Sequence, residues 1–70
     1  MITYNQEFKR TLLGRSVLVM EGERYSFFRI LGENETGLYG YDEECLNREI
    51  QDVRIIGCWQ DDRWLYIEIN

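Results

Sequence analysis

The sequence contains no histidine, and this absence removes much of the usual catalytic chemistry. No imidazole is present to act as a general base, to activate a serine or cysteine, or to bind a metal. Cys45 and Cys58 do not form a Cys-x-x-Cys pair, so they do not supply a standard zinc site alone. The spacing Gly37-x-x-Gly40 lacks the lysine and hydroxyl residue of a phosphate-binding loop. We therefore expect no catalytic residue, no metal and no cofactor.

Proline, low-complexity runs and internal repeats are also absent, and we expect one domain over residues 1–70. No run of about 20 apolar residues exists to cross a membrane. The first ten residues lack the basic-then-apolar order of a signal peptide. One bridge between Cys45 and Cys58 would be no disulfide scaffold, so we expect both to be reduced and partly buried. These features predict a cytoplasmic protein.

The charge is acidic and unevenly spread, with a net value of −5. Residues 1–20 hold one acid against three bases, a balance of +2, and residues 21–70 hold twelve acids against five arginines, a balance of −7. Such a surface repels nucleic-acid phosphates and anionic membranes. It attracts a basic protein surface.

Aromatic residues are numerous, and their large apolar side chains compensate for the small core of a chain that buries only about 60 % of its unfolded surface.

The N-terminal part predicts a short helix over residues 5–13, which Asn5 can cap and Gly14 can end, with Phe8 and Leu12 on one face. Residues 16–20 and 24–31 predict strands joined by a two-residue turn at Gly22-Glu23. That turn sets three pairs opposite each other, namely Glu21 and Arg24, Met20 and Tyr25, and Leu18 and Phe27.

The middle of the chain is ambiguous. Residues 37–41 predict a third strand, in which Gly40 indicates a bulge. Residues 42–50 fit either a helical turn capped by Asp42, with Leu46 and Ile50 on one face, or a loop with irregular pairing.

The C-terminal part predicts a hairpin of residues 53–60 and 63–69 around Asp61-Asp62. Centring the turn on the aspartates pairs Trp59 with Trp64 and Cys58 with Leu65. Alternation then assigns one face to the core, consisting of Ile56, Cys58, Leu65, Ile67 and Ile69. The other face carries Ile55, Gly57, Trp59, Trp64, Tyr66 and Glu68.

These elements predict an α+β fold, a small antiparallel β-sheet with a short N-terminal helix. An SH3-like, partly open barrel is the first choice, and a curled meander with the helix packed on one face is the alternative.

Two groups of residues are candidates for partner binding. The first is the set of carboxylates in loops or at loop edges, which can converge at one end of a small barrel or simply solubilise the chain: Glu33, Glu35, Asp42, Glu43, Glu44, Asp61 and Asp62. For two runs of adjacent carboxylates, a cation site or an acid–base pair is one interpretation and a solvated acidic loop is the other: Asp42, Glu43 and Glu44, and Asp61 and Asp62. The second is an aromatic patch of Trp59, Trp64 and Tyr66, unless Phe8 and Leu12 of the helix cover it.

In size, acidity and lack of histidine the chain resembles the small anti-defence proteins of phages, including anti-CRISPR proteins. The stretches Gly22–Phe27 and Arg63–Ile67 resemble the strands of short SH3-like families. The −7 balance after residue 20 and the lack of catalytic residues predict a non-catalytic inhibitor or adaptor, and the first resemblance implies the same. Its acidic surface is expected to engage a basic, nucleic-acid-binding partner protein and no nucleic acid directly. The alternative is an SH3-like adaptor that holds a peptide on the aromatic patch.

Overall fold

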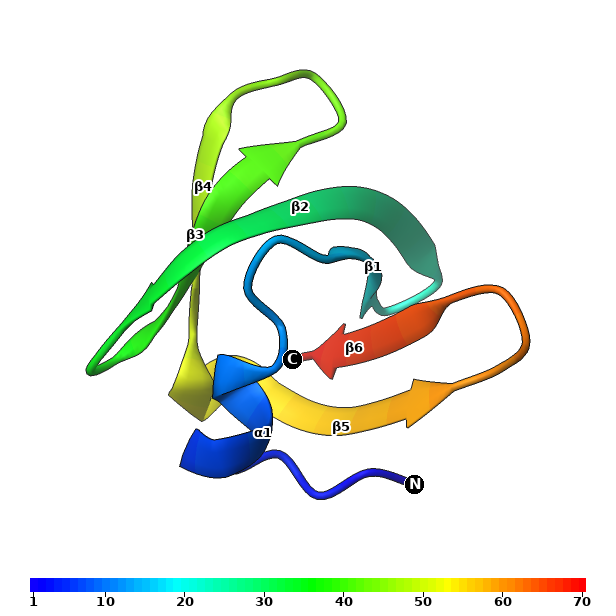
Figure 1. The fold of residues 1–70 in the computed structure, drawn as a ribbon. Coiled ribbons are helices and arrows are strands. Elements are labelled where there is room, and N and C mark those ends of the chain that lie inside the picture. The colour runs from blue at the N-terminus through cyan, green and yellow to red at the C-terminus, as the bar shows by residue number, and fades with distance from the viewer.

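The computed structural model describes residues 1–70 as one curled β-sheet with a short helix near the N-terminus (Figure 1). The strand order is β4-β3-β2-β1-β6-β5, in which β1 and β6 are parallel and all other neighbours are antiparallel. The elements are α1 (Gln6–Arg10), β1 (Ser16–Glu21), β2 (Arg24–Asn34), β3 (Gly37–Asp42), β4 (Asn47–Gln51), the 3-10 turn η1 (Asp52–Arg54), β5 (Ile55–Gln60) and β6 (Leu65–Ile69).

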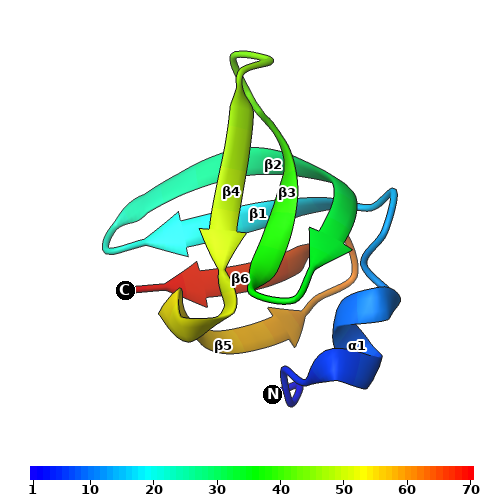
Figure 2. The same ribbon diagram turned by 90° about the vertical axis from the view of Figure 1, so that its left-hand side faces the viewer.

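The sheet is open, so the predicted SH3-like barrel is wrong. Strands β4 and β5 stand at the two ends of the strand order and are joined only through η1 (Figure 2). The purely antiparallel sheet is also wrong, because β6 lies between β1 and β5 and runs parallel to β1. The coarser prediction of a mainly β fold with a short N-terminal helix is confirmed.

The helix is shorter than predicted, but its start is correct. The side-chain oxygen of Asn5 accepts the backbone N–H of Phe8 at 2.8 Å, as an N-cap does. The helix ends at Arg10, and the chain then turns through Gly14, whose φ of 77° suits glycine. Leu12 is fully buried in the core, and Phe8 packs against it.

The β1–β2 hairpin has the predicted register, with Leu18 opposite Phe27 and Met20 opposite Tyr25. A bulge does occur opposite Gly40, but the extra residue is Leu31 of β2. Glycine is needed at position 40 for a different reason, since a Cβ there would collide with the carbonyl oxygen of Arg29.

Residues 42–50 form neither the helical turn nor an irregular loop, but a tight turn followed by β4. The Asp42 carboxylate accepts the backbone N–H groups of Glu44 and Leu46, so it caps a turn and not a helix. Ile50 is buried and Leu46 is exposed, which contradicts a shared face.

The C-terminal hairpin forms with a register two residues away from the predicted one. Trp59 lies opposite Tyr66, and Cys58 lies opposite Ile67. The Asp61 carboxylate accepts the N–H groups of Arg63 and Trp64, which extends the turn beyond the two aspartates. A shift of two preserves the faces, so the predicted core positions hold with one exception.

That exception is Ile56. The β5–β6 ladder is irregular between Ile55 and Gly57, so Ile56 turns outward and Ile55 packs against the core. The core itself comprises Leu12, Val17, Val19, Phe28, Ile30, Leu38, Ile50, Cys58, Leu65, Ile67 and Ile69.

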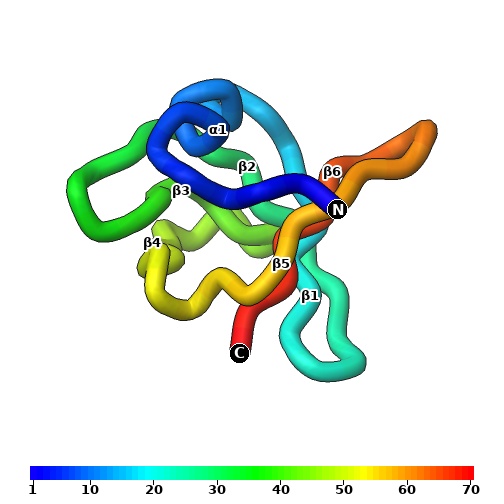
Figure 3. Tube along the Cα trace, turned by 90° about the horizontal axis from the view of Figure 1, so that it is seen from below, coloured from blue at the N-terminus to red at the C-terminus, as the bar shows by residue number.

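The N-terminal segment runs beside β5, as the view from below shows (Figure 3). The backbone N–H of Ile2 donates to the carbonyl of Cys58 at 2.8 Å. No helix in the structure is both long and apolar enough to span a lipid bilayer.

Candidate functional site

A row of apolar side chains crosses four strands on the outer face of the sheet, the face that points away from the core. Trp59 of β5 lies opposite Tyr66 of β6, Tyr66 pairs with Leu18 of β1, and Leu18 lies opposite Phe27 of β2. Because side chains at paired positions share a face, the four stand side by side. Neighbouring positions enlarge this aromatic face, which comprises Leu18, Met20, Tyr25, Phe27, Trp59, Trp64 and Tyr66.

Ring contacts hold the aromatic face together. Trp59 and Tyr66 are stacked, with ring centroids 5.2 Å apart and an interplanar angle of 8°. Phe27 meets Trp64 edge to face at 6.1 Å, and Tyr25 meets Tyr66 in the same way at 6.2 Å. Such pairs contribute about 0.5–1.5 kcal/mol each beyond their burial.

The helix does not cover the aromatic face. Phe8 and Leu12, which could have covered it, pack against the core on the opposite side of the sheet. Tyr25 is 56 % exposed, and Phe27, Trp59, Trp64 and Tyr66 are half-buried. The patch predicted from the sequence contained only Trp59, Trp64 and Tyr66. The correctly predicted β1–β2 register places Tyr25 and Phe27 on one face of that hairpin, but it does not show that β1 lies beside β6.

Carboxylates border the aromatic face. The Tyr66 hydroxyl donates to Asp61 at 2.8 Å, and Glu68 pairs with Met20 across β6 and β1. Hydrogen bonds from the backbone N–H groups of Trp64 and Arg63, and then from Tyr66, lower the pKa of Asp61. The hydrogen bond to Asp61 in turn raises the pKa of the Tyr66 hydroxyl. Asp61 therefore stays charged and fixes both the turn and one ring of the aromatic face.

The predicted acidic residues do not converge on one surface. They lie in three turns or at the strand ends beside them, and these turns, β2–β3, β3–β4 and β5–β6, project from separate corners of the molecule (Figures 1 and 2). Asp42 and Asp61 are engaged in their own turns, and Glu33 lies 3.8 Å from the Arg10 guanidinium. The remaining four make no salt bridge: Glu35, Glu43, Glu44 and Asp62.

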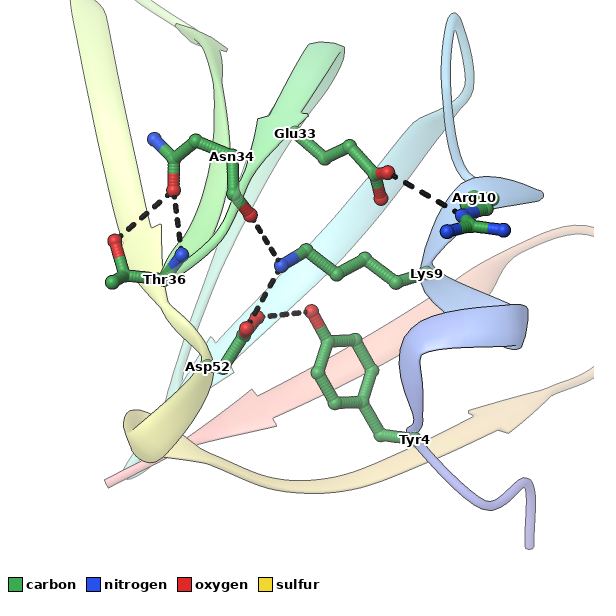
Figure 4. Close-up of polar contacts among 7 residues, drawn as sticks. All are labelled: Tyr4, Lys9, Arg10, Glu33, Asn34, Thr36 and Asp52. Carbon is green, nitrogen blue, oxygen red and sulfur yellow. Dashed lines mark hydrogen bonds and ion pairs between the residues drawn. The ribbon is translucent and has the colours of Figure 1, made fainter.

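A buried polar cluster beneath the helix was not foreseen (Figure 4). The Lys9 side chain is fully buried, and its ammonium donates to Asp52 at 2.8 Å and to the Asn34 carbonyl at 2.7 Å. The Tyr4 hydroxyl donates to the other Asp52 oxygen at 2.6 Å. The only sequence signal is that Lys9 is the single lysine, placed beside apolar helix positions.

The electrostatics of this cluster are those of a structural ion pair. Burial alone would raise the pKa of Asp52, but hydrogen bonds from Lys9 and Tyr4 outweigh it, so the pKa lies below its ordinary value. Burial and the bond to Asp52 raise the pKa of the Tyr4 hydroxyl. The cluster ties the N-terminal segment and α1 to η1 and the end of β2. Lys9 is too deeply enclosed to meet a dissolved substrate.

A polar hollow of about 490 Å³ opens between the β1–β2 and β3–β4 turns, and no hydrophobic side chain lines it. Of the charged side chains that line it, only Glu21 and Arg48 form a salt bridge with each other, at 3.7 Å. No group of three or more cysteine, aspartate and glutamate side chains is arranged to hold a metal ion.

The two cysteines are unbonded and differ in environment. Cys58 is buried in the core, which raises the pKa of its thiol to about 11. Cys45 is exposed in the β3–β4 turn, with a φ of 63°, so the prediction that it is partly buried is wrong.

Comparisons with known proteins add no assignment: no family model, no curated protein sequence and no solved structure matches this chain.

Proposed function

We propose that the chain is a non-catalytic protein-binding module, an inhibitor or adaptor, whose aromatic face contacts a protein with a basic surface. The observation that carries this proposal is the cluster of five aromatic rings left uncovered on one side of the sheet. A connected apolar patch on a small protein marks an interaction surface. Tryptophan and tyrosine are also the residues most enriched at the energetic centres of protein interfaces.

The charge of the chain supports a basic partner. The net charge is −5, and the single lysine is buried against Asp52. A partner's arginine side chains could stack on the rings of the aromatic face and meet Glu68 at its border. Nucleic-acid-binding proteins carry such basic surfaces. An exposed free thiol at Cys45 fits a reducing compartment, so the proposal places the chain in the cytoplasm.

The test begins with capture of the partner from the native host and its identification. Its affinity is then measured by calorimetry for the wild type and for Tyr25→Ala, which removes an exposed ring without opening the core. We expect affinity to fall about 10-fold or more, which corresponds to about 1.4 kcal/mol. Leu13→Ala is the matched control, because Leu13 is exposed to a similar extent and lies outside the aromatic face. Equal affinity for Tyr25→Ala and the wild type would exclude this surface.

The unpaired loop carboxylates have a separate role in the proposal, which is to steer the basic partner toward the module. Changing Glu35, Glu43 and Glu44 together to glutamine removes three charges that make no salt bridge. We expect slower association and a weaker salt dependence, with little change in dissociation, because charges outside the contact act mainly on the on-rate. An unchanged association rate would show that these charges only keep the chain soluble.

A further inference from the structure

The two edges of the sheet differ in whether another segment of the chain pairs with them. At the β5 edge, the N-terminal segment forms a bridge through Ile2 and Cys58. At the β4 edge, no segment pairs with the outer side of the strand (Figures 1 and 2). An unpaired edge presents backbone donors and acceptors to any extended chain that approaches it.

The register identifies which backbone groups face outward. The N–H of Asp42 donates to the carbonyl of Leu46 at 3.0 Å, so these two form a hydrogen-bonded pair. Hydrogen-bonded and non-bonded pairs alternate along an antiparallel ladder. In the β3–β4 register, Arg48 and Ile50 therefore bond to β3. The N–H and C=O groups that point away from the sheet are those of Asn47, Glu49 and Gln51.

A hollow of about 460 Å³ lies next to this edge. Leu31, the bulged residue of β2, and Tyr39 of β3 line it, together with Asn47 and Glu49 of β4. Leu31 is 47 % exposed and Tyr39 is 45 % exposed, so an apolar side chain could bury part of both. A chain paired with β4 would place every second side chain on the side of this hollow.

Four glutamates lie around β4, against the one cation Arg48, which also lines the hollow. Glu43 and Glu44 precede the strand, Glu49 stands at its middle, and Glu35 lines a hollow with Gln51 at its far end. The one cation of the strand, Arg48, is directed to Ser26 and Glu21 across the core side. The edge is therefore complementary to an extended segment that carries lysine or arginine near both ends.

We propose that β4 is the site of β-strand addition by such a segment of a partner protein, which pairs with Asn47, Glu49 and Gln51 and places one apolar side chain in the hollow beside Leu31 and Tyr39. Backbone hydrogen bonds supply affinity in this mode, and the hollow and the carboxylates supply selectivity. The surface is distinct from the aromatic face, and its test does not require the partner of that face.

The probe is the peptide acetyl-Lys-Lys-Val-Leu-Val-Lys-Lys-amide, with a glutamate-for-lysine version as control. Amide hydrogen exchange of the full chain is followed by NMR with and without peptide. We expect the basic peptide to slow exchange at Asn47, Glu49 and Gln51 about 10-fold or more, with little change at Arg48 and Ile50. The acidic peptide should have no effect. Protection confined to β5 or to the aromatic face would overturn the proposal.

A proline substitution tests the edge directly. Glu49→Pro removes an outward N–H and leaves the hydrogen bonds between β4 and β3 in place, and proline is tolerated on edge strands. It should lose the peptide-induced protection, whereas Glu49→Gln should keep most of it, since only a charge is lost. Asn47→Pro provides a second variant if Glu49→Pro does not fold.

Two further readouts separate this proposal from its alternatives. Tyr25→Ala should bind the peptide as the wild type does, so a failure of the aromatic face and a failure of the β4 edge are distinguishable. Sedimentation should show a monomer. A dimer that protects the same three amides would assign the edge to a second copy of this chain, and peptide binding by Glu49→Pro at wild-type strength would exclude strand addition.

Discussion

The ammonium of Lys9 lies 2.8 Å from a carboxylate oxygen of Asp52, and the lysine side chain is fully buried while the aspartate retains some contact with solvent. Loss of the ion pair therefore affects its two members unequally. An ammonium without its partner would have no access to water, but the carboxylate would keep both water and the hydrogen bond from Tyr4.

This asymmetry predicts the effect of breaking the pair from either side. Asp52→Asn should lower the free energy of unfolding by about 3 kcal/mol, because it leaves a buried charge poorly compensated. Lys9→Met should lower the free energy of unfolding clearly less, since methionine keeps a buried aliphatic side chain and Asp52 still reaches water and Tyr4. Urea unfolding of both variants measures the difference. Equal losses would show that burial of the ammonium does not dominate.

The lowered pKa of Asp52 predicts a loss of stability in acid. A carboxyl whose pKa is lower in the folded than in the unfolded state stabilises the fold above its unfolded pKa. This contribution is lost as the pH falls below the ordinary value of 3.8 and through the folded pKa. Urea midpoints measured from neutral pH down to pH 2 should therefore fall less for Asp52→Asn than for the wild type. Asp61→Asn is the comparison variant, because the pKa of Asp61 is also lowered but its carboxyl is exposed. An unchanged acid dependence in Asp52→Asn would contradict the cited shift.

The environments of the two thiols predict different reactivity toward a disulfide reagent such as Ellman's reagent. At pH 8 the folded chain should react rapidly once, at the exposed Cys45. Cys58 is buried and its pKa is about 11, so it should react only as fast as the chain unfolds. Cys45→Ser should abolish the fast phase, and two fast equivalents in the native protein would contradict the burial of Cys58.

Close packing at Gly40 predicts that it is far less replaceable than Gly57. A Cβ at Gly40 would meet the carbonyl of Arg29, which is backbone and cannot move aside, whereas at Gly57 the nearest atom is 3.8 Å away. Gly40→Ala should cost about 2 kcal/mol or more, in the range of overpacked cores. Gly57→Ala should leave the melting temperature nearly unchanged. Similar melting temperatures for the two variants would contradict the close approach of β2 and β3.

Local pairing was predictable from the sequence wherever adjacent residues determine it. The β1–β2 register follows from one glycine turn between Glu21 and Arg24, and the Asn5 cap follows from a single side chain. The last hairpin shows the limit, because the Asp61 side chain widened the turn and moved the register by two. The faces survived that error, since an even shift keeps every residue on its side of the sheet.

Relationships between distant segments were not predictable in the same way. Nothing near β6 in the sequence indicates that it will lie parallel to β1, whose paired positions, such as Leu18 and Tyr66, are 48 residues apart. The Lys9–Asp52 pair was unpredictable for the same reason, because the two residues are 43 positions apart and the sequence around each gives no sign of the other. The aromatic face was predicted in part, because Trp59, Trp64 and Tyr66 belong to one hairpin. Its other members come from β1, which lies beside β6, and from β2, which is two places away in the sheet. The acidic loops were expected to meet because several loops share one end of a small, partly open barrel, and the open sheet does not bring them together.

The position of β6 between β1 and β5 also bears on how the chain folds during synthesis. Strands β1 to β4 are consecutive hairpins, so they can pair as each leaves the ribosome, whereas β1 and β5 have no ladder between them until β6 arrives. Within these 70 residues, the strand that comes last in the sequence is thus the one that joins the two parts of the sheet. Closing so long a segment is entropically costly and slows folding. Until that moment Val19 of β1 lacks its neighbour Ile67, so one side of this core side chain stays uncovered in the nascent chain.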